Sequence, residues 1–195
     1  MTYGHRLREH YKNEYTFSKK DAKRLFYKDK ISDEYLDLLL HNLVRKGELT
    51  RITTGKYTFK DDIMVSGFSF SPFYYGLQEA LSLKNLHEQE TNPVIITIKK
   101  IKPGIRVISG NNVVLKRISR KYFFGFDFIK YYDIEIPVSD PEKTLIDFVY
   151  YNEPLSKETK EELLKIINKQ KLNDYLSKYP EKTRKKVQEI ITNTF

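Results

Sequence analysis

The sequence predicts an α+β protein of two domains, the second with a twisted sheet and a helical C-terminal tail. Three observations support this prediction. Apolar residues recur at helical spacing through most of the first 50 residues, and a short glycine-containing hairpin follows them. Segments with β-type alternation then fill residues 92–138. Helical spacing returns after Asp140 and continues to the end of the sequence. The domains are predicted at residues 1–62 and 63–195, because charge gives way to aromatic residues near Asp61–Gly67.

Composition narrows the range of functions. The 195 residues are 39% apolar and 14% aromatic, which is enough for packed cores. Lysine and arginine exceed aspartate and glutamate by 35 − 26 = 9, and the sequence pI is about 9.4. This imbalance favours a polyanionic partner such as nucleic acid, with a merely basic surface as the alternative.

The chain contains no cysteine. Disulfides, thiolate nucleophiles and cysteine-based zinc sites are therefore excluded, and an intracellular setting is favoured. No apolar run approaches the roughly 20 residues needed to span a bilayer, and the first residues lack a signal-peptide core. We expect a cytoplasmic protein without a membrane partner.

The first domain is predicted to contain a short helix, an extended Tyr15–Phe17 segment, two further helices and a hairpin. Ser18 is expected to cap the second helix and Ser32 the third. Gly47 is expected to end the third helix, and Gly55 supplies the positive φ that a tight hairpin turn requires. This order of elements is that of a winged helix-turn-helix, in which the hairpin is the wing.

In such a domain the recognition helix enters the major groove and the wing lies along the DNA backbone or minor groove. A helical wheel places the leucine stripe of the Ser32–Lys46 helix inward and its polar side outward. Asn42 suits an adenine edge, Arg45 a guanine edge and Leu38 a thymine methyl group. Lysines of the preceding helix and the wing are expected to bind phosphates. The predicted DNA-binding residues are Lys19, Lys20, Lys23, Glu34, Tyr35, Leu38, Asn42, Arg45, Lys46, Arg51, Thr53, Thr54 and Lys56.

One feature opposes DNA binding: the proposed recognition helix carries the carboxylates of Asp33, Glu34 and Asp37. Winged domains also serve as protein-interaction modules. A protein-binding adaptor whose winged domain does not read DNA therefore remains the alternative.

In the second domain, Ser71-Pro72 predicts the start of a helix over residues 72–83. Strands are predicted within residues 92–100, 104–110, 112–119, 123–130 and 132–138. Asp140-Pro141 is expected to begin another helix, in which Lys143 and Asp147 can pair at i, i+4. A well-capped structural helix explains this segment, and docking of a partner on its polar face is the functional alternative. The tail after Ser156 is predicted helical, with Pro180 between its last two helices.

Few residues in this chain suggest catalysis. Asp133 and Glu135 are two apart on a predicted strand, so they would share a face and could hold a metal for phosphoryl transfer. No phosphate-binding glycine loop accompanies them, so a solvated strand face is the favoured interpretation. The four histidines are scattered and do not show zinc-ligand spacing. We expect no catalytic residues, no metal and no cofactor.

Three segments resemble a known family. "GELTRITTGKYTF" is similar to the wing of AbiEi-type antitoxins, the regulators of abortive-infection toxin–antitoxin systems. "SFSPFYYGLQEALSLKNLHEQETNPVIITIKK" resembles the helix-then-strand segment of that family. "YFFGF" followed by "IEIPVSDPEKTLIDFVYY" resembles its Phe-Gly-Phe strand and the Asp-Pro-Glu-Lys helix after it.

The resemblance implies an autorepressing DNA-binding antitoxin. It would bind an operator, expected to be an inverted repeat, as a monomer or weak dimer. Its C-terminal domain would counter a nucleotidyltransferase-like toxin. The residues expected to face that toxin are Asp140, Glu142, Lys143 and Asp147.

Overall fold

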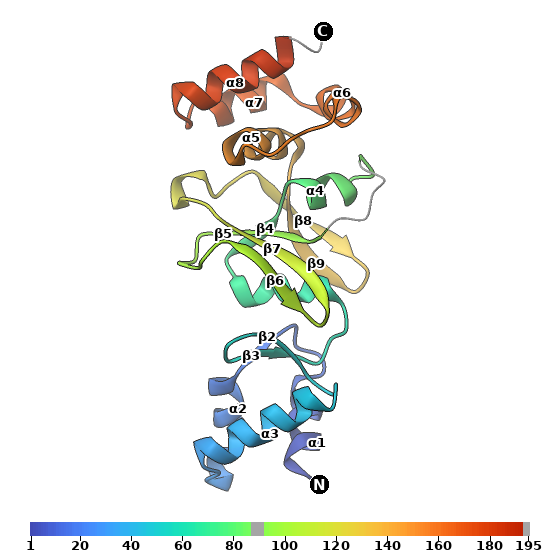
Figure 1. The fold of residues 1–195 in the computed structure, drawn as a ribbon, viewed down its shortest axis with the longest axis vertical. Helices are drawn as coiled ribbons and strands as arrows, with labels where there is room; N and C mark the ends of the chain where they lie inside the picture. The colour runs from blue at the N-terminus through green and yellow to red at the C-terminus, as the bar shows by residue number, and fades with distance from the viewer. Residues whose placement is uncertain (87–91, 193–195) are drawn as a thin grey trace. The chain divides into compact units, whose positions relative to one another are not determined.

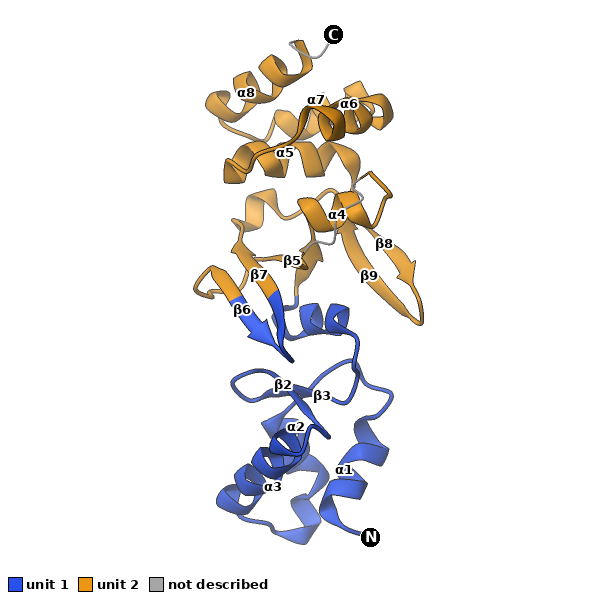
Figure 2. Cartoon of the chain, turned by 45° about the vertical axis from the view of Figure 1, so that its right-hand side comes forward, with its two compact units in different colours: residues 1–71, 106–112 blue, residues 72–105, 113–195 orange. Residues whose placement is uncertain are grey.

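The computed structural model describes residues 1–86 and 92–192, which form two compact units. Unit 1 comprises Met1–Ser71 together with residues 106–112, and unit 2 comprises the remainder (Figure 2). The predicted boundary after Asp62 falls inside unit 1, because the 3-10 helix η2 (Ile63–Phe70) contacts the preceding hairpin. The architecture is mixed α+β (Figure 1).

Unit 1 follows the predicted order of elements. Its elements before η2 are α1 (Tyr3–Tyr11), β1 (Phe17–Ser18), α2 (Lys19–Leu25), η1 (Tyr27–Asp29), α3 (Asp33–Arg45), β2 (Thr50–Thr53) and β3 (Lys56–Thr58). The three strands form a small sheet in the order β1-β3-β2, with both pairs antiparallel. The core beneath it includes Leu7, Ala22, Phe26, Leu36 and Leu40.

Capping residues set the helix starts in unit 1. Ser18 and Asp21 form a reciprocal capping box at the start of α2. Ser32 caps α3, and its Oγ accepts the backbone N–H of Tyr35 at 3.1 Å. Both starts agree with the sequence prediction.

Replacing Ser32 with alanine is expected to lower the free energy of unfolding by about 1 kcal/mol, because one N–H at the start of α3 loses its acceptor. Urea denaturation monitored by circular dichroism measures this change. Ser32→Gly is the matched control, since glycine at an N-cap costs only a few tenths of a kcal/mol, roughly. Equal losses for the two variants would contradict a capping role.

The second sheet has six strands in the order β6-β7-β5-β4-β9-β8, and all of it except residues 106–108 and 111–112 belongs to unit 2. The strands are β4 (Phe73–Tyr75), β5 (Val94–Thr97), β6 (Gly104–Ile108), β7 (Asn111–Arg117), β8 (Phe126–Tyr131) and β9 (Ile134–Ser139). The sheet is mixed, because β4–β9 and β5–β7 are parallel whereas β4–β5 and β8–β9 are antiparallel. The five strands predicted after residue 92 are confirmed.

The helices of unit 2 are α4 (Gln78–Ser82), α5 (Pro141–Tyr151), α6 (Lys157–Ile166), α7 (Lys169–Leu176) and α8 (Glu181–Thr192), with a 3-10 turn η3 (Arg120–Tyr122). Helix α5 lies between the sheet and helices α6 to α8, which are drawn in orange to red in Figure 1. Their apolar residues share a core with β4 and β5 that includes Tyr74, Ile96, Leu145, Leu163 and Leu176. The helical tail is confirmed as far as Thr192, and residues 193–195 lie outside the described residues.

The predicted helix over residues 72–83 is wrong in its first half. Phe73–Tyr75 instead form β4, which lies between β5 and β9 with all three side chains buried. Leu77 then adopts φ 57°, and α4 begins only at Gln78. Burial of three consecutive aromatic residues on a central strand outweighs the local Ser-Pro helix signal, because side-chain packing decides strand formation.

Candidate nucleic-acid interface

Helix α3 presents one exposed ridge on unit 1. Leu36, Leu40 and Leu43 are buried in the core, so the opposite side of the helix faces solvent. The ridge follows the i, i+4, i+7, i+11 spacing of one helical face and consists of Glu34, Leu38, His41 and Arg45. Leu38 is 55% exposed, so this face of α3 is partly apolar.

Two predicted base-contacting residues lie at the side of this ridge. Tyr35 packs edge-on against Tyr3 of α1, with the ring centroids 5.7 Å apart. Tyr35 and Asn42 line a hollow of about 470 Å³ between α1 and α3. Both keep some exposure to solvent, but they flank the outermost face of α3 rather than form it.

His41 is a surface residue that is not among the residues predicted to bind DNA. It is exposed, and it lines a second hollow of about 370 Å³ together with Lys19, Asp37, Arg51 and Thr54. The signal was available, because His41 lies three residues after Leu38 on the same helical face.

The β2–β3 hairpin borders this second hollow. Ile52 and Tyr57 are buried beneath the hairpin, whereas Arg51, Thr53 and Thr54 are exposed and Lys56 is half-buried. Gly55 supplies the turn with φ 70°.

Strand β1 and the start of α2 support the hairpin. Phe17 and Ser18 pair with Tyr57 and Lys56, and the N–H of Lys19 donates to the carbonyl of Gly55 at 3.0 Å. An isolated two-stranded ribbon is marginal in water, so this third strand holds the hairpin in place.

Ion pairs between α2 and α3 change the electrostatics that the sequence suggests. Lys19 Nζ lies 2.6 Å from a carboxylate oxygen of Asp37, and Lys23 Nζ lies 2.9 Å from one of Asp33. The hydrogen bond to Asp37 raises the pKa of Lys19, and the hydrogen bond from Lys23 lowers the pKa of Asp33. Two of the three carboxylates on α3 are therefore offset by neighbouring cations. The same contacts engage two of the lysines that were expected to bind phosphates, whereas Lys20 is exposed.

The four residues predicted to face a toxin are buried. Asp140 and Glu142 are each 3% exposed, and Lys143 and Asp147 are completely buried. The prediction that they form an accessible polar face of the helix is therefore wrong. The physical reason is that α7, β4 and the segment just before β8 cover this side of α5 with polar and aromatic side chains.

Lys143 and Asp147 form a buried ion pair on α5. The hydroxyl of Tyr74 donates to the second carboxylate oxygen of Asp147 at 2.8 Å, and the Lys143 ammonium lies 5.2 Å from the centre of the Tyr74 ring. Burial lowers the pKa of Lys143 and raises the pKa of Asp147, and the contact between the two groups opposes both shifts. Gly125 adopts φ 74°, and a Cβ there would lie 2.9 Å from Cβ of Lys143. The Phe-Gly-Phe segment thus packs directly on the lysine stem.

Asp140 and Glu142 tie α7 to the start of α5. Asp140 caps α5 through the N–H of Lys143 at 2.7 Å, and its other oxygen accepts the Tyr175 hydroxyl at 2.8 Å. Lys171 Nζ lies 3.0 Å from Asp140 and 3.4 Å from Glu142. Burial, then the hydrogen bond to Asp140, raises the pKa of Tyr175 to about 12. This arrangement organises the fold of unit 2 and presents no open site.

The candidate metal pair is not assembled on one strand. Asp133 lies in the turn between β8 and β9, and Glu135 lies on β9 opposite Lys130 of β8. The prediction that both carboxylates share a strand face is therefore wrong. Across residues 1–86 and 92–192, no group of three or more histidine, aspartate or glutamate side chains is placed to hold a metal.

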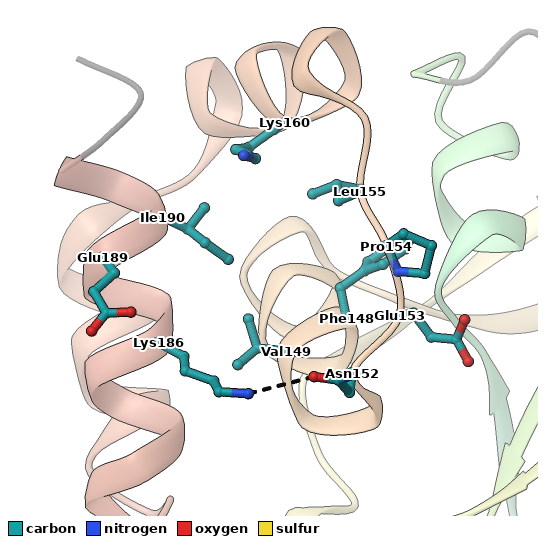
Figure 3. A pocket seen from close by; sticks show the side chains of 10 residues that line it. All are labelled: Phe148, Val149, Asn152, Glu153, Pro154, Leu155, Lys160, Lys186, Glu189 and Ile190. Atoms are coloured by element: carbon teal, nitrogen blue, oxygen red, sulfur yellow. Dashed lines mark hydrogen bonds between the residues drawn. The ribbon is translucent and has the colours of Figure 1, made fainter.

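Unit 2 also contains a cavity of about 560 Å³ among α5, α6 and α8, whose lining residues Figure 3 shows. Apolar side chains of Phe148, Val149, Leu155 and Ile190 contribute to its wall, and Lys186 Nζ lies 3.4 Å from Oδ1 of Asn152. Its charged residues, Lys160, Lys186, Glu153 and Glu189, balance in sign. We therefore assign no ligand to it.

No helix within the described part of the chain is long and apolar enough to cross a membrane.

Comparison with known proteins provides a fold relationship. No family model and no curated protein matches this chain. The crystal structure of the RV2827C protein from Mycobacterium tuberculosis is similar to it, with a TM-score of 0.63 and 12% sequence identity. The match covers 100% of this chain and 78% of that one. At this identity the likeness is one of fold.

Proposed function

We propose that unit 1 is a winged helix-turn-helix that binds duplex DNA and that the protein is a non-catalytic transcriptional regulator. Helix α3 would enter the major groove, and the β2–β3 hairpin would contact the backbone beside it. The observation that carries this proposal is the solvent-facing ridge of α3 with the cationic hairpin fixed next to it. The α2–α3 ion pairs support it further, because they offset the acidic residues that oppose DNA binding.

We further propose that the protein is the autorepressing antitoxin of an abortive-infection toxin–antitoxin pair and counters a nucleotidyltransferase-like toxin. This part rests on the similarity of the wing, Phe-Gly-Phe and Asp-Pro-Glu-Lys segments to AbiEi-type antitoxins. Co-expression with a nucleotidyltransferase-like protein from the neighbouring reading frame tests it. Rescue of growth supports the antitoxin role, and toxicity unchanged by this protein contradicts it.

Binding to the upstream region of the gene itself tests the DNA-binding proposal. We expect a mobility shift at micromolar protein and moderate salt, with an inverted repeat as the preferred site. A scrambled duplex of the same length and composition is the control. Absence of a shift with the upstream DNA would contradict the proposal.

Arg45→Ala tests the base-reading role of α3. Loss of a guanine-directed guanidinium is expected to cost about 1–3 kcal/mol with the operator and to relax specificity at one base pair. Competition binding with single-base operator variants measures both effects. Lys28→Ala removes an exposed cation of η1, outside the ridge, and serves as the comparison. An Arg45→Ala protein with unchanged base preference would show that α3 does not read this position.

A specific observation also favours the alternative function, a protein-binding antitoxin or adaptor. Leu38 and Tyr35 are 55% and 45% exposed and lie beside carboxylates on α3. Exposed apolar residues on a partly acidic helix are suited to protein contact. Co-purification with a toxin that depends on Leu38, without any duplex binding, would favour this alternative.

A further inference from the structure

Residues 92–126, most of which belong to unit 2, form a basic segment of the sequence. Residues 92–126 contain no aspartate or glutamate. The basic residues in this segment are Lys99, Lys100, Lys102, Arg106, Lys116, Arg117, Arg120 and Lys121. A surface on which basic residues of this kind gather is suited to a polyanionic partner.

Strand register brings two parts of this segment together. Strands β5 and β7 are parallel neighbours, and Thr97 at the end of β5 lies opposite Arg117 at the end of β7. The N–H of Ile118 donates to the carbonyl of Thr97 at 2.9 Å, which fixes the two strand ends side by side. The loops that follow both strands therefore leave the sheet at the same edge.

This edge, the β5–β7 edge, is exposed and basic. Its solvent-exposed cationic residues are Lys99, Lys100, Lys102, Arg117, Arg120 and Lys121. Arg117 and Arg120 also line a hollow of about 420 Å³, together with Ile98, Ile118 and Ser119. Lys116, which is adjacent in sequence, is half-buried and pairs with Glu153.

The chemistry of the β5–β7 edge favours the backbone of a duplex over a single strand. Guanidinium groups bind phosphate oxygens in a bidentate manner, and lysines add point charges around them. Single-strand sites instead use exposed aromatic rings as stacking platforms. Among the described residues, the most exposed tyrosine and phenylalanine side chains are Tyr27, Tyr35, Phe128 and Tyr132, and none of these lies in the two loops.

We propose that the β5–β7 edge is a second DNA-binding site, which contacts the phosphate backbone of duplex DNA without reading its sequence. It rests on the proposed function in that duplex DNA is the ligand. The site adds charge contacts from unit 2 to the contacts made by unit 1, so it raises affinity for operator and non-operator duplexes alike.

Salt-dependent binding of the full chain tests this site. Fluorescence anisotropy is measured with the upstream operator duplex and with a scrambled duplex between about 50 and 200 mM salt. In Arg117→Gln/Arg120→Gln, the slope of log affinity against log salt is expected to fall by about 2 on both duplexes, because each phosphate contact contributes about 1. The matched control is Lys182→Gln/Arg184→Gln, which removes two exposed charges from α8 of the same unit and should leave the slope unchanged.

A second edge variant keeps the proposal testable if Arg117→Gln/Arg120→Gln does not fold. Lys100→Gln/Lys121→Gln removes two other charges from the same edge and is expected to lower the slope by a similar amount. Equal slopes for the edge variants and the α8 control would overturn the proposal. It would also be overturned if the edge variants lost binding to a protein partner while their DNA binding stayed intact. Failure of the unit 1 proposal gives a different result. The unmodified protein would then bind the operator and the scrambled duplex with equal affinity, whatever the slopes of the edge variants.

Discussion

Lys143→Met is expected to lower the free energy of unfolding of unit 2 by about 3–5 kcal/mol, because it leaves the Asp147 carboxylate buried without its cationic partner. Asp147 is completely buried and keeps only the Tyr74 hydroxyl as a donor in this variant. Urea denaturation monitored by near-ultraviolet circular dichroism measures the loss, because tyrosines such as Tyr74, Tyr122 and Tyr179 pack in the core of unit 2.

Lys178→Met is the matched control. This variant makes the same lysine-to-methionine change at an exposed position. The Lys178 ammonium lies 4.1 Å from the centre of the Phe124 ring. Exposed charge contacts contribute about 1 kcal/mol or less, so the control should lose little stability. Equal losses for the two variants would contradict the structural importance of the buried pair.

Further replacements separate charge from packing. In Lys143→Met/Asp147→Leu, both charges are removed, and replacing a whole buried pair by apolar residues is often close to neutral. The Tyr74 hydroxyl then loses its acceptor, so full recovery is expected only when Tyr74→Phe is added. A triple variant no more stable than Lys143→Met would show that the loss comes from packing around the lysine stem.

The instability of Lys143→Met should depend on pH in one direction. Burial raises the pKa of Asp147, and in Lys143→Met no lysine opposes this shift, so the protonated carboxyl is the form that the folded variant tolerates. A group with a raised pKa contributes its stability below the unfolded pKa of about 4 and loses it as the pH rises. The deficit relative to the unmodified protein is therefore expected to shrink toward pH 4 and to grow toward neutral pH.

The affinity of unit 1 for operator DNA is expected to fall roughly 10³-fold between 50 and 200 mM salt, as for a protein that makes about six phosphate contacts. Lys20, Arg51 and Lys56 are candidates for three of these contacts, since Lys19 and Lys23 are engaged by α3. Lys56→Ala should weaken all duplexes equally and lower the salt slope by about 1.

Lys28→Ala is the control for Lys56→Ala, because Lys28 is an exposed lysine of unit 1 in η1, outside the predicted contact set. A sequence-selective loss in Lys56→Ala would show that the hairpin reads bases instead of phosphates. Salt-insensitive binding would show that the interaction does not depend on phosphate contacts.

Local signals in the sequence were sufficient for the helix starts and the hairpin turn of unit 1. The caps at Ser18 and Ser32 and the turn at Gly55 each act within a few residues, and all three appear in the structure. The α2–α3 ion pairs were not predictable, because a lysine and an aspartate on different helices give no periodic signal. They decide which cations remain available on the surface.

Unit 2 was less accessible to prediction because its organisation depends on contacts distant in sequence. Lys143 and Asp147 have the i, i+4 spacing of an exposed helix pair, and nothing within the helix indicates burial. Their burial comes from Tyr74, Gly125 and the α7 segment, which lie far from α5 in the sequence. The same distance explains the misassigned Phe73–Tyr75, whose strand partners begin about twenty residues later or beyond.

The contacts of Asp140 and Glu142 also set an order of events during synthesis. Their partners Asn168, Lys171 and Tyr175 leave the ribosome after the whole of α5. Until then the carboxylates at the start of α5 remain hydrated, and the apolar side of that helix has no cover from α7 and α8. Unit 2 of a nascent chain therefore stays open until α7 has been synthesised, and a ribosome that stalls before residue 168 releases a product that chaperones and proteases can recognise.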